Sequence, residues 1–248
     1  MAKRVTKLLA GALALVAASA SSALALTDVK MITFGGASSL PIWIAQDKGL
    51  FAKEGLKIER ETTRSSRAQI KDIVDGKYQF ATTAFDNIVA YHNGTGAVKY
   101  ENFDVIALLG VHGGMNSVVA SGDIKKWSDM KGKTVSVDAV RSGYATVLYQ
   151  ILKKHGLAEK DYKVIAVGGT GARVKSLKEK TAQMAIISSP EDLRLKREGF
   201  NILADAADEI GQYQGSSYAV RRAYAKSNPK EVLAFVRAII AAHDVIHN

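Results

Sequence analysis

Residues 134–156 read TVSVDAVRSGYATVLYQILKKHG, and this stretch predicts a strand, a short polar loop and a helix in succession. Thr134–Asp138 alternates valine with small polar residues, as a strand does. Beyond the loop, apolar side chains at offsets of 3, 4, 7 and 8 from Tyr144 form one face of a helix, which Gly156 ends. The free N–H groups and the positive dipole end of such a helix favour a small anionic or polar molecule bound over the loop.

The loop supplies three candidate ligand-binding residues, Ser142, Gly143 and Tyr144. We expect the N–H groups of Ser142 and Gly143 to point into the ligand site, and the Ser142 hydroxyl to donate to a ligand oxygen. Gly143 has no Cβ and lets the ligand approach the backbone. Tyr144 follows the loop and is expected to stack on the ligand.

The rest of the chain repeats this alternation of strand and helix. Strands are expected at 29–34, 56–61, 78–83, 103–111, 117–120, 162–167, 184–187, 200–203 and 217–220. Helices are expected at 41–47, 86–92 and 191–198, and between a cap at Ser65 or Ser66 and a stop at Gly76. Two more are expected to begin at the loop 168–171 and after Asn228. This order predicts an α/β fold with mostly parallel sheets covered by helices, and the polar segments 112–116 and 212–217 are expected to cross between two lobes.

Residues 1–25 have the features of a signal peptide. Lys3, Arg4 and Lys7 precede the apolar run 8–18, and Ala23-Leu24-Ala25 fits a cleavage site. The run is too short to cross a bilayer, so we expect cleavage after Ala25 and a periplasmic location. The chain has no cysteine. It therefore has no disulfide framework and no thiol to carry a lipid at the cleavage site, and we expect a free protein that folds on a core.

Charge is weak evidence about the ligand. Removal of the leader takes away three cations and lowers the formal net charge from +10 to +7 for the exported chain. No cluster of Lys and Arg interleaved with aromatic residues is present, so no nucleic-acid partner is expected. The positive charge, with Arg64, Arg141 and Arg173, favours an anion such as a sulfonate or a carboxylate.

Short polar loops follow most of the expected strands, and open α/β sheets bind ligands at such strand ends. Any one of these loops alone is better explained as a helix cap or a turn, whereas the set together favours a binding site. The candidate ligand-binding residues are Ser38, Ser39, Trp43, Thr63, Arg64, Thr82, Thr83, Asn116, Ser142, Gly143, Tyr144, Gly169, Thr170, Ser188 and Ser189. Of these, Trp43 either stacks on the ligand or packs against a neighbouring helix.

Motifs that indicate catalysis or a cofactor are weak or absent. Gly169 and Gly171 begin a dinucleotide-like loop, but Val174 stands where a third glycine is needed. There is no Gly-Lys-Ser/Thr phosphate loop and no Gly-x-Ser-x-Gly elbow. His243 and His247 lie four residues apart without a third ligand at metal-binding spacing. We therefore predict no catalytic residue, no cofactor and no metal.

Three segments resemble one protein family. Residues 41–56 (PIWIAQDKGLFAKEGL) look like the opening of the nitrate/sulfonate/taurine and thiamine-precursor substrate-binding proteins of ABC transporters. Residues 129–135 (DMKGKTV) and 148–157 (LYQILKKHGL) match further motifs. The resemblance covers essentially all of residues 28–248.

This resemblance implies a two-lobed periplasmic binding protein of type II-like topology with a ligand cleft between the lobes. Lobe 1 would be residues 27–112 plus 213–248, and lobe 2 residues 117–212. The implied partners are a small-molecule solute, an inner-membrane ABC permease and its ATPase, and the receptor is expected to be a monomer. The solute would be a sulfonate, a nitrate-like anion, a carboxylate or a pyrimidine precursor.

The sequence departs from the family pattern in two places. Glu179–Met184 stands where the family usually has a glycine and an aspartate before the last strand of the second lobe. Family members also continue for further helices beyond the equivalent of Asn248, so we expect lobe 1 to be incomplete at its carboxyl end.

Two other functions stay open at this point. The fold family includes a thiamine-pyrimidine synthase, but that enzyme carries a run of cysteines and this chain has none. The signal peptide also opposes a cytosolic biosynthetic enzyme. A periplasmic ligand carrier that serves a sensor is the other alternative.

Overall fold

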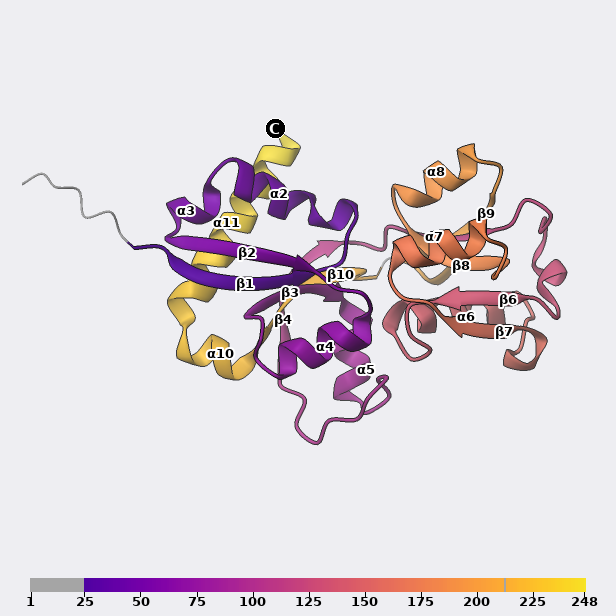
Figure 1. Ribbon diagram of the computed structural model, residues 1–248, viewed down its shortest axis with the longest axis horizontal. Coiled ribbons are helices and arrows are strands. Elements are labelled where there is room, and N and C mark those ends of the chain that lie inside the picture. The colour runs from indigo at the N-terminus through magenta and orange to yellow at the C-terminus, as the bar shows by residue number, and fades with distance from the viewer. Residues whose placement is uncertain (1–24, 212) are drawn as a thin grey trace, which may run out of the picture.

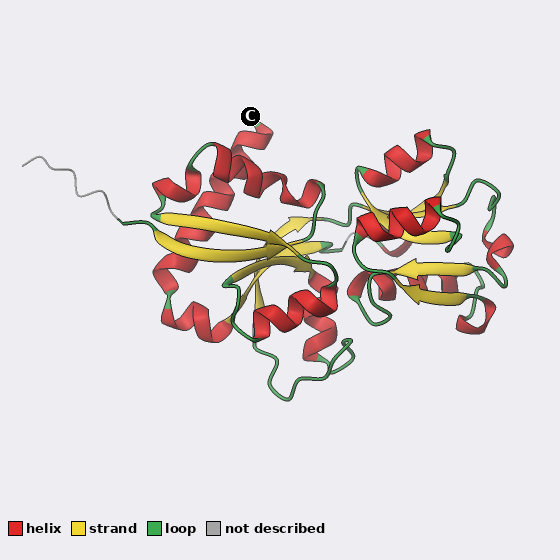
Figure 2. Cartoon of the chain, viewed as in Figure 1, coloured by secondary structure: helices red, strands yellow, loops and turns green. Residues whose placement is uncertain are grey.

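The computed structural model describes residues 25–211 and 213–248, and it contains two α/β lobes side by side (Figure 1). The predicted signal peptide lies outside the described residues, apart from Ala25. Each lobe has a five-stranded sheet with helices on both faces (Figure 2), which confirms the predicted fold class.

The sheet of lobe 1 has the strand order β2-β1-β3-β10-β4. Its strands are β1 (Thr27–Thr33), β2 (Leu56–Thr62), β3 (Phe80–Ala84), β4 (Val105–His112) and β10 (Ser216–Arg221). β1 pairs in parallel with β2 and β3, whereas β10 runs antiparallel to both β3 and β4. The sheet is therefore mostly parallel, with one reversed strand.

Helices cover both faces of this sheet. They are η1 (Ala37–Ser39), α2 (Leu40–Asp47), α3 (Leu50–Lys53), α4 (Ser66–Val74), α5 (Phe85–His92), α10 (Arg222–Ser227) and α11 (Pro229–His247). On one face, Phe235 of α11 stacks on Phe80 of β3 with ring centroids 4.1 Å apart. On the other face, Ile70 and Ile73 of α4 are fully buried in a second apolar cluster. The long α11 thus contributes to the core of lobe 1.

The sheet of lobe 2 has the strand order β7-β6-β8-β5-β9. Its strands are β5 (Asn116–Ala120), β6 (Thr134–Val137), β7 (Lys163–Ala166), β8 (Met184–Ser188) and β9 (Asn201–Asp205). β6 pairs in parallel with β7 and β8, whereas β5 runs antiparallel to β8 and β9. The two sheets therefore have the same arrangement of parallel and antiparallel strands.

The helices of lobe 2 are η2 (Trp127–Met130), α6 (Gly143–Lys154), η3 (Glu159–Asp161), α7 (Thr170–Lys178), α8 (Glu191–Arg197) and α9 (Ala206–Ile210). Leu148 and Ile151 of α6 are fully buried in the larger core cluster, as their spacing predicted. Leu177 of α7 and Leu195 of α8 are buried in a cluster against Val119 and Ile187 of the sheet.

Two crossings join the lobes. The chain leaves lobe 1 after β4 and enters lobe 2 as β5, and it returns after α9 as β10. β5 and β10 are thus the reversed strands of their sheets, while the arrowheads of β1 and β2 point toward those of β6 and β7 (Figure 2). This strand order supports the proposed division into residues 27–112 with 213–248 and residues 117–212. The carboxyl ends of the parallel strands consequently meet between the lobes.

Each expected strand is present within a few residues of its predicted ends. The short helices α3, α9 and α10 were not predicted, because four to six residues carry too little periodicity to reveal a helix. Among the described residues, every helix is too short or too polar to pass through a bilayer.

Candidate functional site

A cavity of about 610 Å³ lies between the two lobes. Loops from the carboxyl ends of strands in both sheets line it, which is where open α/β sheets place their ligands. Lobe 1 contributes the segment 34–38 after β1, residues 62–64 at the end of β2, and His112 at the end of β4. Lobe 2 contributes the start of α7 and Ser188-Ser189 at the end of β8.

Arg173 is the most informative residue in the cavity. It lies in the first turn of α7, is 3% exposed, and donates from Nη2 to Thr170 Oγ1 over 2.9 Å. Its Nε and Nη1 atoms are buried and have no hydrogen-bond partner among the described residues. Burial lowers the pKa of this guanidinium, and the negative charge of Asp138 opposes that effect. A buried cation with free donors is costly unless an acceptor compensates it.

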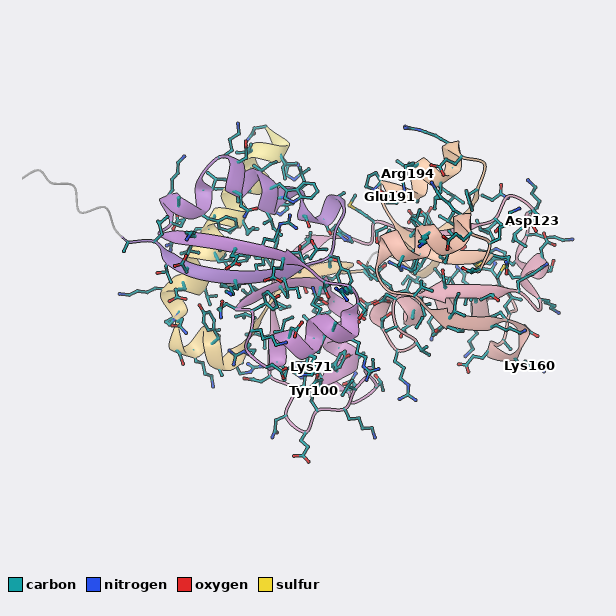
Figure 3. The ribbon with its side chains drawn as sticks, in the orientation of Figure 1. Lys71, Tyr100, Asp123, Lys160, Glu191 and Arg194 are labelled. Carbon is teal, nitrogen blue, oxygen red and sulfur yellow. The ribbon has the colours of Figure 1, made fainter. Side chains whose placement is uncertain are left out.

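The other arginines near the cavity differ in this respect. Arg194 of α8 also lines the cavity, but it forms an ion pair with Glu191 over 2.6 Å, and the two side chains lie together in Figure 3. Arg64 lines the cavity with an exposed side chain. Arg141, which the sequence analysis also named as a cation favouring anions, is exposed and is not part of the lining. Arg173 is therefore the cation best placed to hold a desolvated anion.

Asp138, at the end of β6, lines the cavity and is fixed by two hydrogen bonds. Its Oδ1 accepts from the Ser142 hydroxyl, and its Oδ2 accepts from the backbone N–H of Ser66 in lobe 1 over 3.3 Å. The Ser142 hydroxyl also accepts from the N–H of Ala145 over 3.2 Å and so caps α6. This differs from the expectation that the hydroxyl donates to the ligand, because its proton already points at Asp138.

Direct hydrogen bonds hold the two lobes together around the cavity. The N–H of Gly169 donates to the carbonyl of Arg64 over 3.0 Å. The Tyr144 hydroxyl lies 2.9 Å from Ser216 Oγ and donates to the carbonyl of Gly215 over 3.2 Å. Burial raises the pKa of Tyr144, so the hydroxyl keeps its proton. The structure thus shows a closed arrangement of the lobes.

Ten of the residues proposed from the sequence line the cavity: Ser38, Thr63, Arg64, Thr82, Ser142, Tyr144, Gly169, Thr170, Ser188 and Ser189. They come from both lobes and from loops up to about 150 positions apart in the sequence, because the strand ends of the two sheets meet there.

Five proposed residues lie outside the lining: Ser39, Trp43, Thr83, Asn116 and Gly143. The Ser39 hydroxyl donates to the carbonyl of Phe34 over 3.0 Å, and Thr83 Oγ1 accepts from Asn87 over 3.2 Å. Trp43 lies on α2 with 42% of its surface exposed. These three side chains serve local structure or face away from the cavity.

The two remaining residues make contacts that the sequence could not show. Asn116 bridges Ser188, whose hydroxyl donates to it over 2.7 Å, and Tyr213, whose hydroxyl accepts from it over 3.1 Å. The N–H of Gly143 donates to Oδ1 of Asn87 in lobe 1 over 2.7 Å. This N–H therefore joins the two lobes. The expectation that it points into the ligand site is not met, because Asn87 already accepts from it.

Sequence reasoning did not include Arg173, Asp138, Asn87 and His112 among the candidate ligand-binding residues, although all four line the cavity. A signal for Arg173 was present, since it follows the polar loop by one helical turn and its side chain leans back over that turn. Among the described residues, no group of three His, Asp or Glu side chains is arranged to hold a metal ion.

Two lobes that close over a cavity at their strand ends define the fold of periplasmic binding proteins. The family model described as NMT1/THI5 like matches residues 37–248, and the chain belongs to this family. A curated relative is YtlA of Bacillus subtilis (strain 168), which is named as a binding protein. It is 22% identical over 212 residues, which make up 84% of this chain and 62% of YtlA. The chain therefore spans less than two thirds of the length of this relative.

Solved structures share the fold. The periplasmic nitrate-binding protein NrtA of Synechocystis PCC 6803 superposes with a TM-score of 0.78 at 17% identity, over 88% of this chain and 62% of NrtA. The alkanesulfonate-binding protein SsuA of Xanthomonas axonopodis pv. citri, bound to MOPS, gives 0.72 at 16% identity, over 87% of this chain and 72% of SsuA. At such identities the likeness concerns the fold alone.

Proposed function

We propose that this chain is the solute-binding receptor of an ABC importer, which clamps a small anionic molecule between its lobes and delivers it to a membrane permease. The observation that carries this proposal is Arg173, a buried guanidinium in a residue that lines the cavity between the lobes, whose Nε and Nη1 atoms have no partner among the described residues. An organic or inorganic anion satisfies these donors and neutralises the buried charge. A sulfonate, a nitrate-like anion and a carboxylate all have suitable oxygens.

The surroundings of Arg173 add further support. Thr170 holds its Nη2 atom, so the guanidinium has one fixed orientation. Thr170 and Gly171 also belong to the first turn of α7, where backbone N–H groups and the helix dipole favour negative charge. Protein surrounds the cavity from both lobes, and the lower dielectric of this environment strengthens these electrostatic contacts.

A neutral pyrimidine precursor is a weaker candidate for this cavity. Stacking between two aromatic rings would need a partner for Phe34, which lines the cavity, but Trp43 is exposed outside the lining and the Tyr144 hydroxyl is bonded to the β10 segment. For an enzyme like the thiamine-pyrimidine synthase, the missing feature is the cysteine run, since the sequence has no cysteine. The similarity to the binding protein YtlA, to the nitrate-binding protein NrtA and to the alkanesulfonate-binding protein SsuA also favours a receptor.

A role in transport also determines which partners and which location we expect for the chain. The receptor is proposed to act as a monomer in the periplasm, after cleavage behind Ala25, and to present the closed lobes to an inner-membrane permease with its ATPase. A periplasmic extract of cells expressing the whole chain tests the location. Mass spectrometry of the extracted protein should give Leu26 as its first residue. Recovery only in membranes, with residues 1–25 still attached, would contradict this proposal.

A ligand screen tests the binding function. Nitrate, MOPS, taurine, benzoate, short carboxylates and a neutral aminopyrimidine are compared by thermal shift, followed by calorimetry on the compounds that bind. An anion at 100 times its dissociation constant should stabilise the chain by about 2.7 kcal/mol. Arg173→Met should lose this binding, and Arg141→Met, which changes an exposed arginine outside the lining, should retain it. Binding of only the neutral compound, or equal anion binding by both variants, would overturn the proposal.

A further inference from the structure

Asp86 is a buried acid at the contact between the lobes. It is the second residue of α5 in lobe 1 and faces Gly143 in the first turn of α6 in lobe 2. A Cβ placed on Gly143 would lie 2.5 Å from Asp86 Cγ and 2.7 Å from its Oδ1, so the carboxyl group is in direct contact with the other lobe. The adjacent bond from Gly143 to Asn87 fixes this contact.

Both carboxyl oxygens of Asp86 are buried and lack a hydrogen-bond partner among the described residues. The groups that influence it from the neighbouring elements are Asp138 at the end of β6, Tyr144 on α6 and Tyr213 in the crossing before β10. Not one of these three groups is a cation. A charged carboxylate in this position is therefore desolvated without compensation.

Protonation relieves this cost. Burial raises the pKa of Asp86 to about 7, its own backbone N–H opposes the rise, and the negative charge of Asp138 adds to it. When the lobes separate, the carboxyl group faces water and its pKa returns toward the ordinary value of 3.8. The closed state thus binds a proton that the open state releases at intermediate pH.

We propose that closure of the two lobes takes up a proton at Asp86, so that this side chain is a proton-linked latch between α5 and α6. The direction follows from linkage, because the state with the higher proton affinity is favoured as pH falls. Between the ordinary pKa and the raised one, the ratio of closed to open molecules should fall by about tenfold for each unit of rising pH. Above the raised pKa the ratio should become constant.

The pKa of His112, at the first crossing, shifts in the opposite direction to that of Asp86. The effects of the two groups on closure must therefore be measured separately. Its Nδ1 accepts from the N–H groups of Gly114 and Met115, and burial lowers its pKa. Protonation of His112 at acid pH would therefore disturb the crossing. An Asp86→Asn variant isolates the latch, since the amide has nearly the same shape, cannot ionise, and leaves His112 unchanged.

The absence of cysteine allows the lobes to be labelled selectively. Lys48→Cys after α2 and Lys196→Cys on α8 place one spin label on an exposed position of each lobe (Figure 1). Pulsed electron–electron double resonance then measures the distance between the two spin labels in the ligand-free chain, at about pH 5 and about pH 8. Because no solute is added, the result does not depend on the proposed transport function.

The wild-type chain should show mainly the short distance at the lower pH and gain a longer one at the higher pH. Asp86→Asn should show the short distance at both. Asp123→Asn, an exposed acid of lobe 2 remote from lobe 1 (Figure 3), should behave as the wild type does. A carbon-13 titration of the Asp86 carboxyl should have its midpoint at about 7. Equal wild-type distances at both pH values, or a midpoint near 3.8, would overturn the latch.

Discussion

The backbone N–H of Gly143 donates to Oδ1 of Asn87 over 2.7 Å, and this bond joins the first turn of α6 in one lobe to α5 in the other. Gly143 allows it because α5 approaches closer than a side chain would permit: an added Cβ would lie 2.9 Å from the backbone nitrogen of Asn87. The glycine of the loop is thus required for contact between the lobes.

Gly143→Ala should therefore prevent full closure. Overpacking at a close contact typically costs about 1–3 kcal/mol, and here this cost applies to the closed state. Small-angle scattering should give a larger radius of gyration than for the wild type. Gly171→Ala is the matched control, because an added Cβ there has no neighbouring atom within 4 Å. Identical scattering from the two variants would show that the approach of α5 does not limit closure.

The buried charge of Arg173 should destabilise the ligand-free chain. Arg173→Met removes a desolvated cation and keeps an apolar stem of similar length, so the free energy of unfolding should rise by about 1–4 kcal/mol in the absence of ligand. Urea unfolding measures this change. Arg173→Lys keeps the charge and loses the planar fork, and it should bring no such gain. A loss of stability in Arg173→Met would mean that the guanidinium is already compensated in the ligand-free protein.

The hydroxyl of Ser142 should contribute more than an ordinary helix cap. It caps α6 through Ala145 and also donates to the carboxylate of Asp138. Ser142→Ala should lose about 1 kcal/mol for the cap and about 1.5–3 kcal/mol for the bond to a charged group.

Ser65→Ala is the control for Ser142→Ala. Ser65 caps α4 through the N–H of Ala68 over 3.3 Å, and its hydroxyl donates to no carboxylate among the described residues. Its replacement should cost only the cap. Equal losses in urea unfolding for the two variants would show that the bond to Asp138 adds nothing to stability.

The sequence was sufficient to predict the elements because their periodicity is local. The valines of β6 alternate with small polar residues, and the apolar face of α6 repeats at helical spacing, so both segments fold as predicted. The order of the strands in each sheet was harder to predict from the sequence. That β10 lies between β3 and β4 depends on contacts between residues more than 100 positions apart, which local periodicity does not reveal. The resemblance to a family implied only that the carboxyl-terminal segment returns to lobe 1.

The binding loops were predictable for a similar reason, and the roles of single residues were not. Ser188 and Thr170 line the cavity because Ser188 ends β8 and Thr170 begins α7, and such positions can be recognised from the pattern of strands. Gly143 was assigned to the ligand because the start of a helix offers free N–H groups. Its actual acceptor, Asn87, lies 56 positions away, and no local pattern indicates which lobe surface will satisfy a given donor.

The last prediction concerns the ring of His112, which organises the first crossing between the lobes. Its Nδ1 accepts from the N–H groups of Gly114, over 3.2 Å, and Met115, over 3.1 Å, so the ring must be neutral at this nitrogen. Burial lowers the pKa of His112 below its ordinary value of 6.5. The unfolded chain therefore binds a proton at a pH where the folded chain does not, and the stability that the neutral ring provides is lost as pH falls below 6.5.

His112→Asn tests this, since its side-chain oxygen takes the place of Nδ1 as an acceptor and cannot be protonated in this range. The free energy of unfolding should be measured for both proteins in steps between about pH 5 and about pH 8. Asp86 contributes equally to both curves and cancels in their difference. The wild type should lose stability relative to the variant as pH falls, because only its acceptor is removed by protonation. A constant difference across this range would show that the crossing holds its shape without the neutral ring.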